Sequence, residues 1–595
     1  MVIRLADNIY SPLGRTTADN YRAVVDGHSA MRQYRLPDGS LYTASLFPEA
    51  ERHDDGEYTF FEQLCIASAS DAIARARIDP ASPRVQFLLS TTKGNVHLLA
   101  EGDTERATPS YSATLISRHF GNPNPPIVVS NACISGVSAQ IIAMRSIEAG
   151  LCDIAVVIGC DMQSEFIISG FQCLHALSPD PCRPFDKERC GLNLGEAAAT
   201  IIYSGRQTAD RGQWAIAGGA MCNDANHISG PSRTGEGSYR CLQALGIDPG
   251  EAAFISVHGT STLYNDEMES IAIDRAGLSD VPIFSLKGTF GHTMGAAGVL
   301  ETILSIQAVE HGIVYGTRGF AEMGVSRKVN ISPCHRTTDR HSFVKLMSGF
   351  GGCNAAILLK QQCDCHSVSK PQCPDVSRSR DYTVSTIHIT PSKVVLNGKE
   401  LPHSEHGAAM LTELYRTHVD EYPKYFKMDP LCRVSFVASE LLLKAGKHED
   451  CAVLLFNRSA SLADDTAFQA TLGHGADWYP SPALFVYTLP NIATGEIAIR
   501  NHFQTETNFM VLDSLRPDII GQQAALAAQH EDVLTGWVEC TDADHFEAVL
   551  LTVPRHTPAQ EITTNIKKFH FDSEAENYKH KYINKKTSWK SSYSN

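Results

Sequence analysis

Short apolar runs alternate with longer amphipathic stretches over the first 360 residues of the chain. The runs are rich in Val, Ile and Leu, as buried strands are, whereas the stretches repeat apolar residues every three to four positions, as helices do. This alternation predicts an α/β protein in which helices cover the strands. The predicted strands are Val85–Leu89, Ile127–Val129, Ile154–Ile158, Phe254–Val257 and Ala355–Leu359, and the predicted helices are Phe61–Ala76, Ser135–Ala149 and Val299–Glu310.

The alternating pattern stops at residues 361–382, which are polar, contain two prolines and show no periodicity. We therefore expect a linker between a first domain over residues 1–360 and a second domain over residues 383–555. Residues 556–595 are rich in Lys, Tyr and Ser and poor in aliphatic side chains, a composition that predicts a mobile basic tail.

The second domain repeats features of the first domain at a fixed spacing. Leu431-Cys432 lies 367 positions after Leu64-Cys65, and a predicted strand follows each pair at the same distance. His502-Phe503 lies 383 positions after His119-Phe120, and each of these pairs also precedes a strand. Two matches in the same order indicate that the second domain is a second copy of the first half of the first domain.

Composition narrows the range of functions. The net charge of −15 over 595 residues argues against a protein that binds nucleic acid by neutralising phosphates. No stretch approaches the roughly 18 consecutive apolar residues of a membrane span. The 17 cysteines are scattered and follow no secretion signal, which favours free thiols in a reducing cytoplasm over disulfides.

Cys133 is the candidate nucleophile. It follows the predicted strand Ile127–Val129 and precedes a predicted helix, so we expect it at a helix N-terminus, where backbone N–H groups lower the thiol pKa below its ordinary value of about 8.5. The small neighbours Ala132, Ser135 and Gly136 are expected to leave room for an acyl group. Taken alone, such a residue is more often a buried structural cysteine.

Two histidines fall at strand and helix ends later in the first domain. His258 follows the predicted strand Phe254–Val257, and His292 precedes a helix within a glycine-rich segment. Either histidine alone is more often structural. Together with Cys133 and the glycine-flanked turn at residues 349–352, they form an ordered set typical of a thiol nucleophile with imidazole partners.

The segments that carry these residues are, in order, NACISG, PFDKERCGLNLGEAAA, HGTSTLYND, SLKGTFGHTMGAAG and SGFGGCN. In this order they resemble the β-ketoacyl-acyl carrier protein synthases of the thiolase superfamily, over roughly residues 1–360. The resemblance implies a thiolase-like fold, layered α-β-α-β-α with two similar halves, and a second, half-thiolase-like α/β domain. It also implies carbon–carbon bond formation on substrates carried by an acyl carrier protein, with no cofactor and no metal.

The resemblance implies a role for each candidate residue. Cys133 holds the growing acyl chain, and His258 and His292 stabilise the enolate formed when a malonyl thioester loses carbon dioxide. His292 stands where initiating synthases carry Asn, which indicates the elongating Cys-His-His type, and its helix N-terminus should keep it neutral. The remaining candidates are the supporting ion pair Lys287 and Glu301, the acidic residues Glu196 and Asp266, for which a structural role is at least equally favoured, and Phe350 and Gly351 of a gate loop, with the Cys133 and Phe350 N–H groups as oxyanion donors.

Four positions depart from the family pattern. Cys353 stands where a hydroxyl residue is usual, Ala197 and Ala198 replace part of a glycine-rich stretch, and Ser348 stands where an aromatic is common. These changes bear on the shape of the acyl tunnel and the setting of the gate loop more than on the reaction.

The second domain lacks catalytic residues. At the offset of 383, Cys133 projects onto the neighbourhood of Arg516, and no cysteine occurs between Cys451 and Cys540. The half that carries the histidines is absent. This domain resembles the chain-length factors that pair with active synthases in polyketide and aryl polyene assembly, which implies an inactive partner that closes off the acyl pocket. A copy retained only for stability is the alternative.

Two weaker signals lie in the linker and the tail. Cys363, Cys365, His366 and Cys373 could bind zinc, but their spacing lacks paired CxxC knuckles and favours a linker. The lysines of the tail could attract an acidic carrier protein, although a solvated tail is the simpler interpretation.

The sequence therefore predicts a condensing enzyme that elongates a fatty acyl, polyene or polyketide-like chain, and the fused copy favours a specialised pathway. A non-catalytic partner subunit that sets chain length is one alternative, which the retention of Cys133, His258 and His292 disfavours. A thiolase that uses Cys353 as its second cysteine is the other. Whether the catalytic domain forms a homodimer or pairs with the second domain stays open.

Overall fold

The computed structural model describes residues 1–36, 39–205, 212–362, 384–445, 450–472 and 480–569. Within these residues, the first domain is built on two β-sheets whose strands are arranged in the same order. In each sheet a strand lies parallel to neighbours on both sides, and two antiparallel strands follow. The first sheet runs β5 (Ile127–Val129), β4 (Val85–Ser90), β6 (Ile154–Asp161), β8 (Ala197–Ser204), β1 (Val2–Tyr10), and the second runs β11 (Pro282–Phe284), β10 (Ala252–Ser256), β15 (Ser342–Ser348), β16 (Cys353–Gln361), β9 (Trp214–Asn223).

Two helices lie between the sheets and contact both of them: α4 (Ser135–Glu148) and α9 (Ala297–Glu310). Both are buried along almost their whole length, and each contains only two charged residues. A side chain at Gly136 would lie 2.9 Å from the Val299 nitrogen. Gly136 is therefore small because α9 packs against it, and the prediction that it leaves room for an acyl group is wrong.

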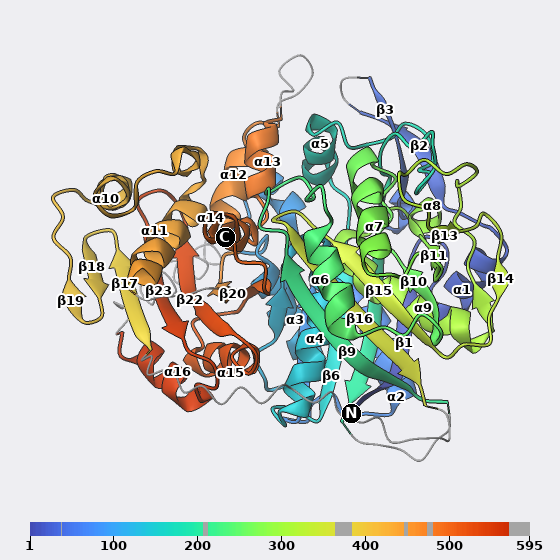
Figure 1. The fold of residues 1–595 in the computed structure, drawn as a ribbon, viewed down its shortest axis with the longest axis horizontal. Helices are drawn as coiled ribbons and strands as arrows, with labels where there is room; N and C mark the ends of the chain where they lie inside the picture. Colours follow the sequence, from blue (N-terminus) through green and yellow to red (C-terminus); the bar gives the residue numbers. More distant parts are fainter. Residues whose placement is uncertain (37–38, 206–211, 363–383, 446–449, 473–479, 570–595) are drawn as a thin grey trace, which may run out of the picture.

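Further helices cover the outer faces of the two sheets and complete the α-β-α-β-α layering of a thiolase-like fold (Figure 1). Every strand and helix predicted for this domain is present, with its bounds shifted by a few residues. The outer helices are α2 (Phe60–Ala76) and α3 (Pro109–His119) on the first sheet, and α6 (Glu236–Leu245) and α7 (Leu263–Arg275) on the second. Smaller elements include α1 (Thr17–Val25), β2 (Met31–Arg35), β3 (Leu41–Ser45), α5 (Glu165–Cys173) and α8 (Lys287–Phe290).

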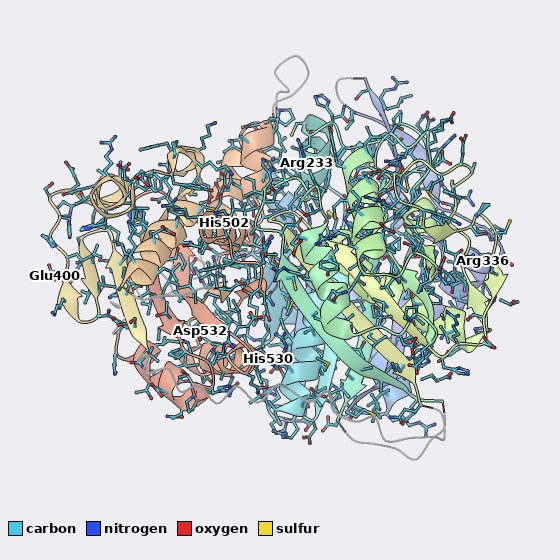
Figure 2. The ribbon with its side chains drawn as sticks, viewed as in Figure 1. Arg233, Arg336, Glu400, His502, His530 and Asp532 are labelled. Carbon is cyan, nitrogen blue, oxygen red and sulfur yellow. The ribbon has the colours of Figure 1, made fainter. Side chains whose placement is uncertain are left out.

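The second domain repeats the strand order of the first sheet, with three parallel and two antiparallel strands. Its outermost hairpin ends at Glu400, on the side away from the first domain (Figure 2). The strands run β21 (Thr507–Val511), β20 (Cys451–Asn457), β22 (Asp532–Cys540), β23 (Phe546–Val553), β17 (Ser385–Thr390), and the main helices are α11 (Pro430–Lys444), α14 (Ile492–Asn501) and α15 (Pro517–Ala527). Shorter helices are α10 (Gly407–Leu414), α12 (Leu462–Gln469) and α13 (Pro482–Tyr487).

The two domains share one continuous sheet, because β21 pairs antiparallel with the edge of β5. Val511 lies opposite Val128, and the difference between these numbers is 383, the offset of the sequence repeat. Equivalent residues of the two copies therefore face each other across a local two-fold axis. Figure 1 shows the second domain, in yellow-orange to red on the left, beside the first domain, which runs from blue through green to yellow.

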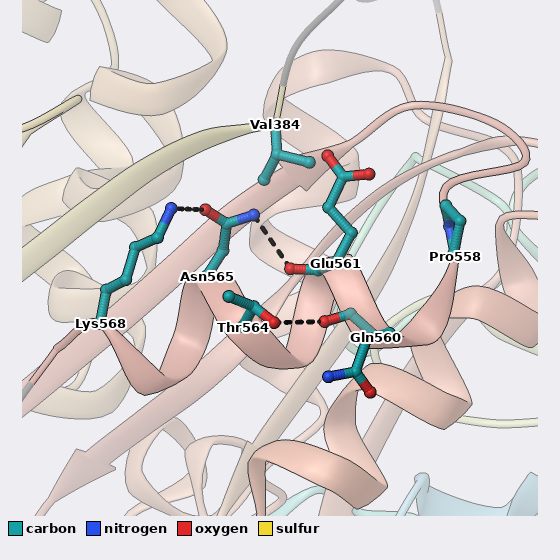
Figure 3. Close-up of a pocket in the computed structure, with 7 residues that line it drawn as sticks. All are labelled: Val384, Pro558, Gln560, Glu561, Thr564, Asn565 and Lys568. Carbon is teal, nitrogen blue, oxygen red and sulfur yellow. Dashed lines mark hydrogen bonds between the residues drawn. The ribbon is translucent and has the colours of Figure 1, made fainter.

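The predicted tail begins too early, because Ala559–Lys567 forms helix α16. Ile562 and Ile566 lie on one face of this helix and are fully buried, with α15 as the neighbouring helix. Several residues of α16, among them Glu561 and Asn565, line a surface pocket (Figure 3). Within the helix, Asn565 Nδ2 donates to Glu561 O at 3.0 Å. The four-residue spacing of the two isoleucines indicates a helix with one apolar face. The composition of the whole tail, which is mostly polar, does not show this pattern.

The predicted linker and the rest of the tail fall largely on residues 363–383 and 570–595, which lie outside the described residues. So do the candidate zinc ligands Cys363, Cys365, His366 and Cys373. In the part of the chain that the structure describes, no helix has the length and apolarity needed to cross a membrane.

Candidate active site

Cys133 lies just beyond the carboxyl end of β5, in a single turn of 3-10 helix that leads into α4. The preceding residue, Ala132, has a φ of +46°, a backbone conformation that costs on the order of 1 kcal/mol or more outside glycine. Ser135 closes the turn: its hydroxyl accepts from Asn131 N (2.8 Å) and donates to Ala132 O (2.6 Å). This strained turn holds the sulfur at the carboxyl edge of the sheet.

His258 and His292 meet Cys133 at this edge. The Cys133 sulfur lies 2.9 Å from His292 Nε2, and the two imidazole rings are 5.1 Å apart and nearly perpendicular. The sulfur and one ring nitrogen of each histidine all lie within 4.8 Å of one another. The three side chains can therefore contact one substrate carbonyl group at the same time.

Both imidazoles are neutral near pH 7. Burial, followed by the positive charge of Lys287, holds the pKa of each histidine well below the ordinary value of 6.5. Met294 N donates to His292 Nδ1 (3.3 Å), so the remaining proton of His292 is on Nε2, which faces the sulfur. His292 is neutral as predicted, but the causes are burial and nearby lysines.

A buried ion network adjoins the histidines. Glu301 of α9 pairs with Lys287 through one oxygen and with Lys345 Nζ through the other (2.5 Å). Lys345 also donates to Val257 O (3.0 Å), the residue before His258. Two ammonium groups and one carboxylate leave a net positive charge here, which disfavours imidazolium and favours an anion at the same place.

Lys345 is a supporting residue that sequence reasoning missed. Burial lowers the pKa of Lys345 to about 8, although the Glu301 carboxylate raises it in part. Lys345 is the single charged residue in the apolar strand β15, between Ser342 and Ser348. A lone charge in a buried strand requires a partner, and this was the available signal.

Two carboxylates of α7 hold the turn that carries His258. Glu269 accepts from His258 N (2.6 Å) and from Gly259 N (2.9 Å). Asp266 accepts from Ser261 N (3.1 Å), and burial raises the pKa of Asp266 to about 6. Asp266 is thus close to the site through the backbone. Glu269 was not predicted, although it lies one helical turn beyond Asp266.

Glu196 is not brought to the Cys133 cluster. Its carboxylate accepts from Phe47 N and from Gln163 N, both at 2.8 Å, and it pairs with Arg52. These contacts join three segments of the first domain, so the structural role is the one that the geometry favours.

The predicted lowering of the thiol pKa is wrong. Burial raises the pKa of Cys133 to about 12, and the charge of Lys287 offsets only part of this effect. A thiolate at this edge would lose its hydration, and the protein does not provide enough polar contacts in its place. The cost of desolvation therefore exceeds the attraction between the thiolate and Lys287. Cys133 is therefore a thiol at neutral pH.

The gate loop, residues 349–352, joins β15 to β16 and lies against the nucleophile turn. A side chain at Gly349 would lie 3.2 Å from Cys133 N. Gly351 has a φ of +87°, and the ring of Phe350 packs against Phe171 with centroids 6.4 Å apart.

Two groups hold the carbonyl oxygen of Phe350. Cys353 Sγ donates to it at 3.2 Å, and Asn491 Nδ2, from the second domain, donates to it at 2.8 Å. Asn491 was missed because nothing in its local sequence relates it to a loop some 140 residues away.

The structure also shows where the residues that depart from the family pattern lie. Ser348 Oγ donates to Asn354 Oδ1 (2.8 Å), and Cys353 fills the space beneath the gate loop. Ala197 and Ala198 are fully buried in β8.

Two family models match the first domain. The family described as "Beta-ketoacyl synthase, N-terminal domain" matches residues 8–209, and "Beta-ketoacyl synthase, C-terminal domain" matches residues 214–321. Nodulation protein E of Rhizobium meliloti (strain 1021) is 31% identical over 291 residues, covering 46% of this chain and 72% of the relative. The 3-oxoacyl-[acyl-carrier-protein] synthase 2 of the same strain is 28% identical over 419 residues, covering 60% of this chain and 98% of the relative.

A likeness in fold extends into the second domain. The solved structure "PfaC Keto synthase-Chain length factor" aligns with a TM-score of 0.71 and 12% identity, and it covers 93% of this chain and 78% of that one. A thiol beside two neutral imidazoles on a thiolase-like fold defines a condensing enzyme that transfers acyl groups. The chain belongs to the β-ketoacyl synthase family.

Proposed function

We propose that this chain elongates an acyl group held as a thioester on Cys133 by condensing it with malonyl-acyl carrier protein. The observation that carries the proposal is the meeting of Cys133, His258 and His292 within 4.8 Å. A thiol can exchange thioesters, and two neutral N–H donors in a buried site can stabilise an enolate oxygen.

The reaction divides into two half-reactions. In the first, the Cys133 sulfur attacks the acyl thioester, and the carrier leaves as a thiol with the proton that Cys133 loses. In the second, a malonyl thioester releases carbon dioxide, and the electron pair of the broken bond forms an enolate whose oxygen accepts from His258 and His292. The enolate carbon attacks the acyl carbonyl, a carbon–carbon bond forms, and the sulfur of Cys133 leaves and regains a proton.

The ion network supports the second half-reaction. Lys287 and Lys345 share a single carboxylate, that of Glu301, so the site carries positive charge before the substrate arrives. Negative charge that develops on the enolate oxygen is stabilised by this fixed charge and by the imidazole N–H groups. Because no group must reorient for this stabilisation, it acts mainly on the transition state.

We infer that the second domain is a non-catalytic partner within the same chain. Its strand β21 occupies the edge of β5, and Arg516 stands at the position equivalent to Cys133. A second copy of the chain then has no free β5 edge to pair with. The solved structure named "PfaC Keto synthase-Chain length factor" supports a chain-length-factor-like role for this domain.

Carrier recognition and cellular location complete the proposal. The synthase 2 relative is named for an acyl carrier protein, which supports a carrier-bound substrate. All cysteines of the described residues are free, which supports a reducing, cytoplasmic compartment.

A thiolase is less well supported. The buried Cys353 thiol is directed at the Phe350 carbonyl, and burial holds the pKa of Cys353 well above its ordinary value. A purely non-catalytic subunit is also less well supported, because the Cys133 cluster is intact.

The test is intact-mass analysis of a carrier protein after incubation with malonyl carrier and a series of acyl primers. We expect a mass increase on the carrier that corresponds to one condensed unit, and we expect none with Cys133→Ala. An undiminished rate in Cys133→Ala would show that the nucleophile is assigned wrongly. Product lengths across the primer series would identify the chain that the enzyme builds.

A further inference from the structure

The second domain reaches the catalytic loops of the first domain directly. Asn491, the residue that precedes helix α14, donates from Nδ2 to the Phe350 carbonyl oxygen at 2.8 Å. The same nitrogen lies 3.7 Å from Cys353 Sγ. The gate loop is therefore bonded to a residue that belongs to the non-catalytic copy.

A second set of bonds joins the same two domains beside the gate loop. Asn223, at the end of β9, donates to Gly351 O (2.9 Å) and to Thr507 Oγ1 (3.0 Å). Asn131, two residues before Cys133, donates to Thr507 O (2.9 Å). Thr507 of β21 thus links the nucleophile turn to the gate loop through two asparagines.

Close packing alone does not fix the orientation of the Phe350 peptide group. Helix α14 approaches the loop so closely that a side chain at Gly495 would lie 2.7 Å from Gly351 O. Yet Gly349 and Gly351 flank Phe350, and glycine permits backbone rotation that other residues resist. Of the two donors to Phe350 O, the Cys353 thiol is the weaker, so the Asn491 amide is the main bond to this oxygen. The N–H of the same peptide group, on Gly351, donates to Ile228 O at 2.6 Å, so the peptide is held from both sides.

The amide of Asn491 is paired on its donor side only. Its other polar atom, Oδ1, is buried and has no hydrogen-bond partner among the described residues. An unpaired buried acceptor costs about 1–3 kcal/mol, a cost that an apolar side chain would avoid. The donor side of the amide, which holds the gate loop, is the property that distinguishes Asn491 from such a side chain.

We propose that Asn491 is a positioning residue for the condensation, supplied by the non-catalytic domain. It holds the Phe350 carbonyl and so keeps the gate-loop backbone against Cys133 N. This inference rests on the proposed function, because the loop is assigned its role by the condensation. The second domain is then a part of the active site, in addition to any effect on chain length.

The test compares Asn491→Ala and Asn491→Asp with Asn501→Ala, a change at the other end of α14. Asn501 bonds Glu440 within the second domain, so its loss leaves the gate loop untouched. For both Asn491 variants we expect the kcat of condensation to fall about 10–100-fold while the KM for carrier changes less than about twofold. Asn491→Asp should lose at least as much as Asn491→Ala, because a carboxylate cannot donate to Phe350 O.

A second readout separates positioning from simple destabilisation. A loosened gate loop should expose the Cys133 thiol, so alkylation by iodoacetamide, followed by peptide mass, should become several-fold faster while condensation slows. Asn501→Ala should change neither rate. Wild-type rates in Asn491→Ala, or a parallel fall of both rates with the melting temperature, would overturn the inference.

The positioning role of Asn491 and the proposed condensation can fail independently of each other. If the wild-type chain elongates no primer, the proposed condensation fails. The alkylation rates of the Asn491 variants then still decide whether the second domain restrains the loop.

Discussion

The first half of the catalytic domain and the second domain share one sheet topology but differ where the chain leaves the strand. After β5 the chain passes through the strained turn at Ala132 and presents Cys133 beside two imidazoles. After β21 it passes Arg516, which pairs with Asp513 at 3.0 Å, and enters α15. The sheet is a scaffold in both copies, and a few residues beyond a strand end decide which copy carries chemistry.

The two copies also differ in what lies opposite their strand ends. His258 and His292 reach Cys133 from the second sheet of the first domain. The second domain contains no equivalent of that sheet in its described residues, so its strand end faces no imidazole pair. A copy without these groups can contribute only contacts, and Asn491 and Thr507 make two of its contacts at the site.

The largest effect is expected when the cysteine is moved from the first domain to the equivalent position of the second domain. In a Cys133→Ala, Arg516→Cys double variant we expect condensation to stay at least about 10³-fold below wild type, because a thiol at position 516 has no imidazole partners. Carrier-bound product measured by intact mass provides the check. Recovery of product in the double variant would mean that the second strand end is also competent.

The histidines give the next largest effect. His258→Ala and His292→Ala should each slow malonyl decarboxylation about 10²–10³-fold, because each removes one donor to the enolate oxygen. Figure 2 shows His530 in the second domain, and we expect His530→Ala to leave the rate within about twofold. Release of labelled carbon dioxide is the measurement, and equal losses in all three variants would contradict the assignment.

The pH dependence of alkylation should distinguish Cys133 from an ordinary exposed cysteine. With a thiol pKa of about 12, alkylation by iodoacetamide should rise about tenfold per pH unit from pH 7 to 10 without levelling off. Condensation should show no inflection near pH 6.5, because both histidine pKa values lie well below it, and on the acid side the rate should fall only at lower pH. A plateau of alkylation below pH 9 would refute the raised pKa.

Stability distinguishes the ion network of the active site from an ion pair in the second domain. Glu301→Gln should lower the free energy of unfolding by about 3–5 kcal/mol, because it leaves two buried ammonium groups without their carboxylate. Glu440→Gln removes a looser pair with the partly exposed Arg500 (3.4 Å) and should cost about 1 kcal/mol. Urea unfolding measures both values, and similar losses would show that burial does not distinguish the two networks.

Much of the fold could be predicted from short windows of sequence. Apolar runs such as Ile127–Val129 and the helix from Ser135 appear within a few residues of their predicted bounds, because hydrophobic periodicity is a local signal. The repeat at an offset of 383 anticipated the equivalence of β5 and β21, which the antiparallel pairing of Val128 with Val511 makes visible. Helix α16 escaped prediction because only two isoleucines carry its pattern.

The reactive residues were recognisable in the sequence, since Cys133, His258 and His292 each stand next to a strand or helix end in a distinctive motif. Their electrostatics were not, because a pKa depends on the water that the whole fold removes and on charges such as Lys345 that arrive from other strands. The bond from Asn491 to the gate loop likewise exists only when two separate domains pack together. Local pattern can locate a functional group, but its environment is a property of long-range packing.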